Sequence, residues 1–171
     1  NKSNTIGILI SSLSFGSELL LDGVKKDLSA DYSALLCVYN SDGANERSKL
    51  DLLMRQRVAG VVAAFSGDPE SIPVYGELME RYGMPVVLID RSIPGLHLPV
   101  VRHDHFASTY EGTKALINLG HRKIRFASVS MSRLLESTSL RIDGYTKAMQ
   151  EAGLGGAIHI TEEMGYKEWT R

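Results

Sequence analysis

Residues 119–124 read Leu-Gly-His-Arg-Lys-Ile, and they join an amphipathic helix to an apolar strand. Gly120 supplies the positive φ that commonly ends a helix, and His121 to Lys123 bring charge to the free carbonyls of the last helical turn. The following residues, 124–127 (Ile-Arg-Phe-Ala), have the pattern of a strand. The stretch therefore predicts a helix end and a strand start, and its wider meaning depends on its neighbours.

On both sides of this stretch, short apolar strands alternate with amphipathic helices. Residues 5–10 (Thr-Ile-Gly-Ile-Leu-Ile) form a nearly continuous apolar run, as in a central parallel strand that is covered on both faces. The alternation predicts an α/β protein with a parallel sheet and helices on both of its faces. We expect strands at 5–10, 34–39, 58–65, 85–89, 98–101, 125–129 and 157–160, and helices at 17–28, around 50–54, and at 73–82, 107–119 and 137–153.

Composition narrows the functional classes. The chain has 171 residues, enough for one domain or two small ones, and its net charge of −1 gives no support for nucleic-acid binding by this chain itself. The single cysteine, Cys37, excludes an internal disulfide and a cysteine-based zinc site, and its apolar surroundings indicate a buried thiol. No apolar run approaches the ~20 residues of a membrane span, and the polar start leads directly into a strand, without a signal peptide. These features fit a cytoplasmic protein.

The expected sheet selects candidate binding residues without reference to any family. Ligands of open parallel sheets bind beyond the carboxyl ends of the strands, at the point where the strand order reverses. The rule selects Ser11 and Ser12 after the first strand, Phe65 and Ser66 after the third, and Asp90 and Arg91 after the fourth. The alternative for Asp90 and Arg91 is a solvated turn without a binding role.

The motifs of common enzymes are absent from the sequence. No Gly-x-Gly-x-x-Gly follows the first strand, and there is no Walker loop and no Gly-x-Ser-x-Gly elbow, so we expect no cofactor and no catalysis. His103-Asp104-His105 is the one segment that suggests a metal, because residues 103 and 105 would share a face of a strand. The alternative, which we favour, is a polar segment where the chain passes from one domain to the next.

Four motifs, in this order, carry a family resemblance. They are residues 5–10 with the serine-rich loop and Phe15 after them; 57–62 (Arg-Val-Ala-Gly-Val-Val); 84–91 (Met-Pro-Val-Val-Leu-Ile-Asp-Arg) followed by 101–104; and 119–124 followed by 141–145 (Arg-Ile-Asp-Gly-Tyr). Together they resemble the effector-binding domain of the lactose-repressor/galactose-repressor family of bacterial transcription regulators. His105 departs from the asparagine that is common there, and Ala64 stands where some members have a polar contact.

The resemblance implies a periplasmic-binding-protein-like fold in which a small molecule lies between two α/β lobes. Residues 1–102 would form the first lobe and 103–171 the beginning of the second, with 101–104 as the hinge. The resemblance further implies that Ser11, Asp90, Ser137 and Arg141 contact the ligand, and that Phe15 is an apolar residue that packs on it. A carboxylate, a guanidinium and an aromatic ring suit a polyol or sugar. Arg141 could otherwise be a surface residue.

The resemblance further implies a sensor whose effector modulates operator binding. An N-terminal helix-turn-helix would precede Asn1, and the rest of the second lobe would follow Arg171. A homodimer is expected, with the helices at 18–28 and 72–82 as candidate surfaces, although we favour a core role for Leu20, Val24 and Leu28. The alternatives are a periplasmic sugar-binding protein of a transport system and an enzyme, and no catalytic constellation favours the enzyme.

Overall fold

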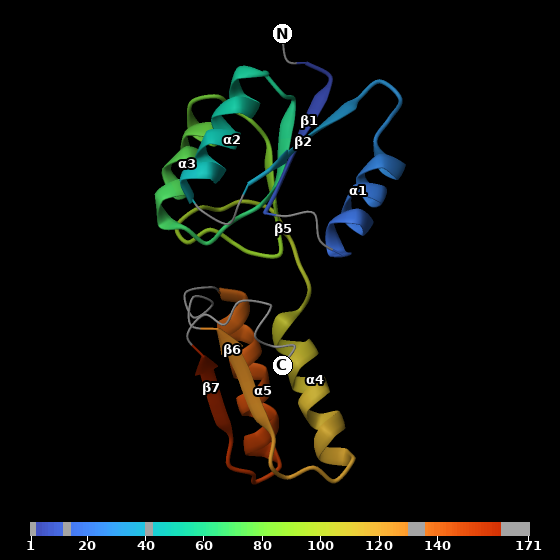
Figure 1. Ribbon diagram of the computed structural model, residues 1–171, viewed down its shortest axis with the longest axis vertical. Helices are drawn as coiled ribbons and strands as arrows, with labels where there is room; N and C mark the ends of the chain where they lie inside the picture. The colour runs from blue at the N-terminus through green and yellow to red at the C-terminus, as the bar shows by residue number, and fades with distance from the viewer. Residues whose placement is uncertain (1–2, 12–14, 40–42, 130–135, 162–171) are drawn as a thin grey trace. The chain divides into compact units, whose positions relative to one another are not determined.

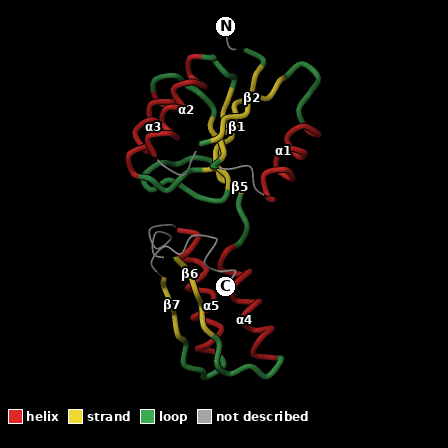
Figure 2. Tube along the Cα trace, in the orientation of Figure 1, coloured by secondary structure: helices red, strands yellow, loops and turns green. Residues whose placement is uncertain are grey.

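In the computed structural model, which describes residues 3–11, 15–39, 43–129 and 136–161, the chain is divided into two units. The first unit comprises residues 1–102 and the second residues 103–171. Figure 1 labels the helices α1 to α5 and several strands of the two units, and Figure 2 distinguishes helices from strands. Both units combine parallel strands with helices, so the expected α/β class is confirmed.

Nine elements of the first unit follow one another along the chain, and all the pairings within its sheet are parallel. The strand order is β2-β1-β3-β4-β5, so the chain leaves β1 for one side of the sheet and then returns to the other side. The order therefore reverses at β1 and β3. The elements are β1 (Thr5–Ile10), α1 (Phe15–Asp27), β2 (Ser33–Val38), α2 (Gly43–Arg55), β3 (Gly60–Ala64), the short 3-10 helix η1 (Pro69–Ser71), α3 (Ile72–Glu80), β4 (Val86–Ile89) and β5 (Val100–Val101).

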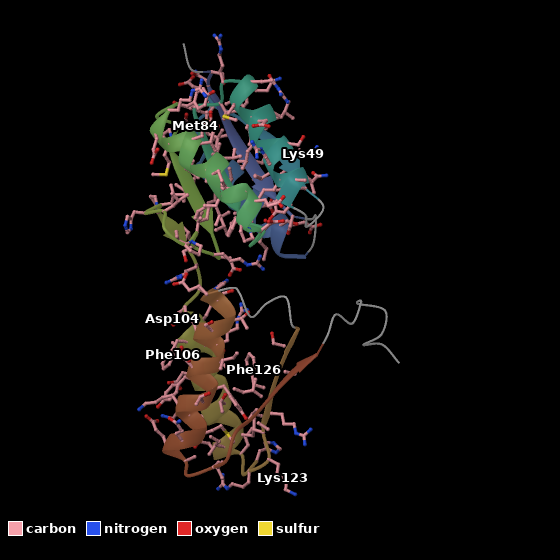
Figure 3. All side chains as sticks on the ribbon, turned by 90° about the vertical axis from the view of Figure 1, so that its left-hand side faces the viewer. Lys49, Met84, Asp104, Phe106, Lys123 and Phe126 are labelled. Carbon is pink, nitrogen blue, oxygen red and sulfur yellow. The ribbon has the colours of Figure 1, made fainter. Side chains whose placement is uncertain are left out.

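The core of this unit lies between one face of the sheet and the helices α2 and α3, which lie together in Figure 1. Burial of these aliphatic and aromatic side chains is the main stabilising contribution, at roughly 25 cal/mol per Å² of apolar surface. Met84, which Figure 3 labels, belongs to this core where the chain enters β4. The fully buried members are Leu9 from β1, Leu50 and Leu53 from α2, Ala63 from β3, Tyr75 and Leu78 from α3, and Leu88 from β4.

Helix α1 lies on the other face of the sheet from α2 and α3 (Figure 1). It begins at Phe15, two residues before the start at residue 17 that the sequence predicts, so Ser17 lies inside the helix. Leu20, Val24 and Leu28, for which a core role was expected, are only half-buried. Among the described residues, α1 is the one helix that covers this face, which explains why its apolar side chains are not enclosed.

The second unit has two helices packed against each other on one side of a two-stranded parallel sheet (Figures 1 and 3). Phe126 of the sheet packs on Tyr145 of the second helix, with ring centroids 5.8 Å apart. The expected helix end at Gly120 is confirmed, because this residue has a φ of +93° and follows the last helical turn. The elements are α4 (His105–Asn118), β6 (Arg125–Val129), α5 (Glu136–Glu151) and β7 (Ala157–Thr161).

Helix boundaries account for the remaining differences. Helix α4 begins two residues earlier than expected because the Asp104 carboxylate accepts a hydrogen bond from the Ala107 amide (2.8 Å) and caps the helix. His105 thus lies in a helix, and the strand geometry considered for a metal site is wrong. Helix α5 begins at Glu136, one residue before the expected start at residue 137, and ends at Glu151. Helix α3 ends at Glu80, two residues before the expected end at residue 82, and Tyr82 is 47% exposed.

Candidate functional site

The carboxyl edge of the first sheet gathers most of the residues that topology selected. Ser11 follows β1, Phe65 follows β3, and Asp90 and Arg91 follow β4. Since these three strands are parallel neighbours, their carboxyl ends meet at one edge of the sheet. The strand order also reverses here, which is the position where open α/β sheets bind ligands.

Asp90 has an unusual backbone conformation at this edge. Its φ is +68°, and the Arg91 amide donates across it to the Ile89 carbonyl oxygen (2.8 Å), which is the pattern of a γ-turn. The γ-turn with positive φ is rare and strained, and aspartate tolerates positive φ better than most residues. The Asp90 amide is satisfied by the carbonyl oxygen of Val101 (2.9 Å). Held strain of this kind concentrates at ligand-binding and catalytic positions.

Arg91 is anchored to the adjacent strand end by its guanidinium group. Its Nη1 atom donates to the carbonyl oxygens of Phe65 and Ser66, each at 3.2 Å. Its Nε atom lies 3.6 Å from the Asp90 carboxylate, beyond hydrogen-bond distance, and is buried without an acceptor among the described residues. The side chains of Asp90 and Arg91 are about one-third exposed, so both remain accessible to a small molecule.

Tyr39, which directly follows β2, joins the same edge and was not selected by the sequence analysis. Its buried hydroxyl donates to the carbonyl oxygen of Ala64 (2.7 Å). Burial raises the pKa of Tyr39 and the nearby Glu46 carboxylate raises it further, whereas Arg91 and a hydrogen bond with the Ser11 side chain act in the opposite direction. Tyr39 therefore lies within the electrostatic influence of both charged groups at this edge.

Glu46 is the second residue that the sequence analysis missed. It lies in the first turn of α2 and is fully buried, with 0% exposure. Its carboxylate accepts hydrogen bonds from the loop after β3 and from α3. The spacing from Glu46 to Leu50 and Leu53 could have revealed it, because i, i+4 and i+7 place these residues on the same buried helix face. The donors are the Ser66 amide (3.1 Å), the Ser66 hydroxyl (2.5 Å), the Ser71 hydroxyl (2.6 Å) and the Tyr75 hydroxyl (2.7 Å).

The second unit carries the other two candidate side chains on α5. Ser137 is buried in the first turn, with 2% exposure, and Arg141 is half-buried one turn later. Helix α5 is fixed by Tyr145, whose hydroxyl donates to the Ile124 carbonyl oxygen (2.8 Å) and accepts from the Ala157 amide (2.9 Å). One tyrosine thus ties α5 to the residue before β6 and to the first residue of β7.

The structure therefore brings together Ser11, Asp90 and Arg91, with Phe65 beside them. The Phe65 ring belongs to the core and packs edge-to-face on Tyr75, with centroids 5.9 Å apart, so its carbonyl group is what it offers at the edge. Ser12 lies outside the described residues, as does the side chain of Phe15. Ser137 and Arg141 belong to the separate second unit.

Other chemistries find little support. Among the described residues, no group of three histidine, cysteine, aspartate or glutamate side chains is placed to hold a metal ion. No helix in the described ranges is both long and apolar enough to cross a membrane. A pocket of about 250 Å³ opens between α5 and β7. Of the residues that line it, Tyr145 alone has a titratable side chain. The other lining residues are Thr146, Met149, Gln150, Leu154, Gly156 and Ile158.

Comparison with known proteins agrees with this architecture. Residues 4–164 match the family described as periplasmic binding proteins and sugar binding domain of LacI family. The chain is 25% identical over 159 residues to the HTH-type transcriptional repressor PurR of Pasteurella multocida, covering 90% of this chain and 46% of that protein. It is 28% identical over 157 residues to the ribose operon repressor of Escherichia coli, with the same coverage of each.

Among solved structures, the Cra transcriptional dual regulator of Pseudomonas putida, in complex with fructose 1-phosphate, is similar with a TM-score of 0.81. The identity is 21%, and the match covers 94% of this chain and 58% of that one. At this identity the likeness shows a shared fold. The chain spans about half the length of the curated relatives that it matches.

Proposed function

Since the chain belongs to the family of periplasmic binding proteins and LacI-type sugar-binding domains, we propose that it is the small-molecule sensor of a bacterial DNA-binding transcription regulator. The names of its curated relatives, which are transcriptional repressors, support the regulator over a transport protein. The sensor binds and does not catalyse, and it needs no cofactor.

The observation that carries the proposal is the pair Asp90 and Arg91 at the switch point of the first sheet. A partly exposed carboxylate accepts hydrogen bonds from hydroxyl groups, and an anchored guanidinium donates in a fixed direction. With Ser11 at the same edge of the sheet, these groups suit a ligand that carries several hydroxyls. We therefore propose a sugar or a related small metabolite as the effector, with Ser12 and Phe15 as further contacts.

In this proposal residues 1–102 form the first lobe and residues 103–171 the beginning of the second, which contributes Ser137 and Arg141. An effector that contacts both lobes favours whichever lobe arrangement lets it do so, and this preference is what couples binding to a distant site. Operator DNA is contacted by an N-terminal helix-turn-helix outside this chain. The regulator acts in the cytoplasm as a homodimer, which matches a palindromic operator.

The test is isothermal titration calorimetry of the full chain with D-ribose, D-fructose 1-phosphate and hypoxanthine. Asp90→Asn removes the charge while keeping a residue that tolerates positive φ, and we expect it to weaken binding at least tenfold. Arg141→Lys, which loses the planar fork, should weaken binding as well. Asp31→Asn and Arg125→Lys are matched controls, because both residues are exposed.

Binding of D-ribose or D-fructose 1-phosphate that is lost in the site variants and kept in the controls supports the proposal, whereas binding of hypoxanthine alone would overturn the proposed effector class. Binding that survives Asp90→Asn would remove Asp90 from the site. A cooperatively folded wild-type chain that binds none of the three compounds would overturn the proposed effector class.

A further inference from the structure

The buried Glu46 carboxylate connects four segments of the first unit. It extends from α2, and its four hydrogen-bond donors come from the loop after β3, from the residue before α3 and from α3 itself. A carboxylate that is removed from water is costly unless hydrogen bonds replace its hydration, and here both oxygens are satisfied twice. The arrangement is therefore fixed in geometry, because moving any donor leaves a buried charge short of a partner.

Ser66 carries this constraint to the edge of the sheet. Both its amide and its hydroxyl donate to Glu46, one to each carboxylate oxygen. Its own carbonyl oxygen, and that of Phe65 before it, accept the two hydrogen bonds from Arg91 Nη1. The position of the Arg91 guanidinium thus depends on a peptide segment that Glu46 holds from the opposite side.

We propose that Glu46 is a positioning residue of the effector edge: acting through Ser66, it fixes the carbonyl oxygens that orient the guanidinium of Arg91. The proposal rests on the proposed function only in treating Arg91 as an effector contact. Glu46 itself is fully buried and touches no ligand.

The hydrogen-bond inventory makes Glu46→Gln a selective change. The Ser71 hydroxyl has a second acceptor, the Asp68 carbonyl oxygen at 2.9 Å, so it can donate there and accept from a glutamine amide. The Ser66 hydroxyl already accepts from the Asp68 amide (3.0 Å), so a glutamine NH₂ in place of Oε2 leaves its proton without an acceptor. If the glutamine amide is flipped, its NH₂ group takes the place of Oε1, and two donors, this NH₂ and the Ser66 N–H, then face each other. Both orientations disturb Ser66.

The chain offers a matched pair of serine variants, in which Ser66→Ala is the test and Ser71→Ala is the control. Ser66→Ala and Ser71→Ala each remove one serine hydroxyl from the same carboxylate oxygen, but only Ser66 is linked to Arg91. The measurement is the set of guanidinium N–H signals of Arg91 in ¹⁵N-resolved NMR spectra of the full chain at low temperature, assigned by their loss in Arg91→Lys. Wild type and Ser71→Ala should show separate Nη signals, because hydrogen bonds slow rotation of the group. Glu46→Gln and Ser66→Ala should lose at least fivefold in the intensity of those signals.

Separate Nη signals that persist in Glu46→Gln and Ser66→Ala would overturn the positioning role, as would their absence from the wild type. Should Glu46→Gln not fold, the Ser66→Ala and Ser71→Ala pair decides alone. For any compound that binds, Ser66→Ala should weaken affinity at least fivefold more than Ser71→Ala. A wild type that binds no compound but shows the expected NMR pattern would sink the proposed effector class and leave the positioning of Arg91 standing.

Discussion

Gly144 of α5 lies directly against the carbonyl oxygen of Phe106 in α4, and the two helices meet there backbone to backbone. A Cβ on residue 144 would lie closer than 3.0 Å to that oxygen and 3.0 Å from the Tyr110 amide nitrogen. Figure 3 labels Phe106, two residues after the helix cap Asp104. Gly144 and Tyr145 of the 141–145 motif thus serve the packing of the second unit, while Arg141 at the start of the motif is half-buried.

We predict that Gly144→Ala destabilises the protein, although glycine to alanine in a helix usually stabilises it. The alanine should gain about 1 kcal/mol of helix propensity, but it collides with backbone, and overpacking costs about 1–3 kcal/mol or more. Gly112→Ala in α4 is the control, because a Cβ there meets nothing within 4 Å. Urea unfolding should show a net loss for Gly144→Ala and a gain of about 0.5–1 kcal/mol for Gly112→Ala. Equal stability of the two variants would contradict the close packing.

Tyr145→Phe should destabilise the second unit through one hydroxyl. That hydroxyl bonds the Ile124 carbonyl oxygen and the Ala157 amide, so its removal leaves two backbone groups without these partners. These hydrogen bonds are partly buried, so we expect a loss of about 1 kcal/mol, the usual net contribution of a hydrogen bond. Hydrogen exchange of the Ala157 amide should accelerate, and urea unfolding should move to lower concentration. The exposed Tyr82→Phe change should stay within about 0.5 kcal/mol of wild type. An unchanged Ala157 exchange rate would argue against the hydroxyl bridge.

The strands were the best predicted part of the fold. Residues 5–10 and 125–129 form strands with the expected bounds, and for residues 5–10 the nearly continuous apolar run explains why the bounds were clear. The helix end at Gly120 was equally clear from the sequence, since positive φ favours glycine. Arg122 completes that end as expected, by donating to the Ile117 carbonyl oxygen (2.9 Å).

Less predictable features depend on contacts between distant segments. Sheet topology selects Asp90 and Arg91 from the sequence, but the anchoring of Arg91 on the Phe65 and Ser66 carbonyls needs two strands in register. The spacing from Leu50 and Leu53 places Glu46 on the buried face of its helix, but only its donors, 20 to 29 residues away, explain how a carboxylate is tolerated there. Phe65 was selected because it follows the third strand, and only the packed structure shows that its ring belongs to the core while its carbonyl oxygen accepts from Arg91.

Helix ends give a third prediction. Helices α2, α4 and α5 end in the same pair of hydrogen bonds, of the Schellman type, around a residue with positive φ. That residue is Gly120 in α4 and Gly153 in α5, but it is Arg57 in α2, with a φ of +52°. Side chains disfavour this conformation by roughly 1–2 kcal/mol. Arg57→Gly should therefore raise the free energy of unfolding by about 1 kcal/mol, and Gly120→Ala should lower it by a similar amount. Calorimetric melting temperatures that shift in the same direction for both variants would contradict this reading.

The response to alkaline pH follows from buried groups of the first unit. Desolvation raises the pKa of Cys37, and burial together with the Glu46 carboxylate raises the pKa of Tyr39 and of Tyr75. Each group keeps its proton in the folded state at a pH where the unfolded chain has lost it. The folded state then binds more protons than the unfolded state, so stability falls as pH rises.

We therefore predict that the free energy of unfolding declines above about pH 9 and more steeply above about pH 10, where unfolded thiols and then phenols ionise. Each tyrosine lowers the free energy of unfolding by about 1.4 kcal/mol per pH unit once the pH exceeds the pKa of that tyrosine in the unfolded chain. Urea unfolding between pH 7 and 10.5 measures the slope. Tyr75→Phe lowers the stability at pH 7, because Glu46 loses a donor, but it should also reduce the alkaline slope by one tyrosine's share. The exposed Tyr82→Phe change should leave that slope as it is in the wild type. A wild-type stability that stays level up to pH 10.5 would show that Tyr39 and Tyr75 ionise as readily in the folded state as in the unfolded chain.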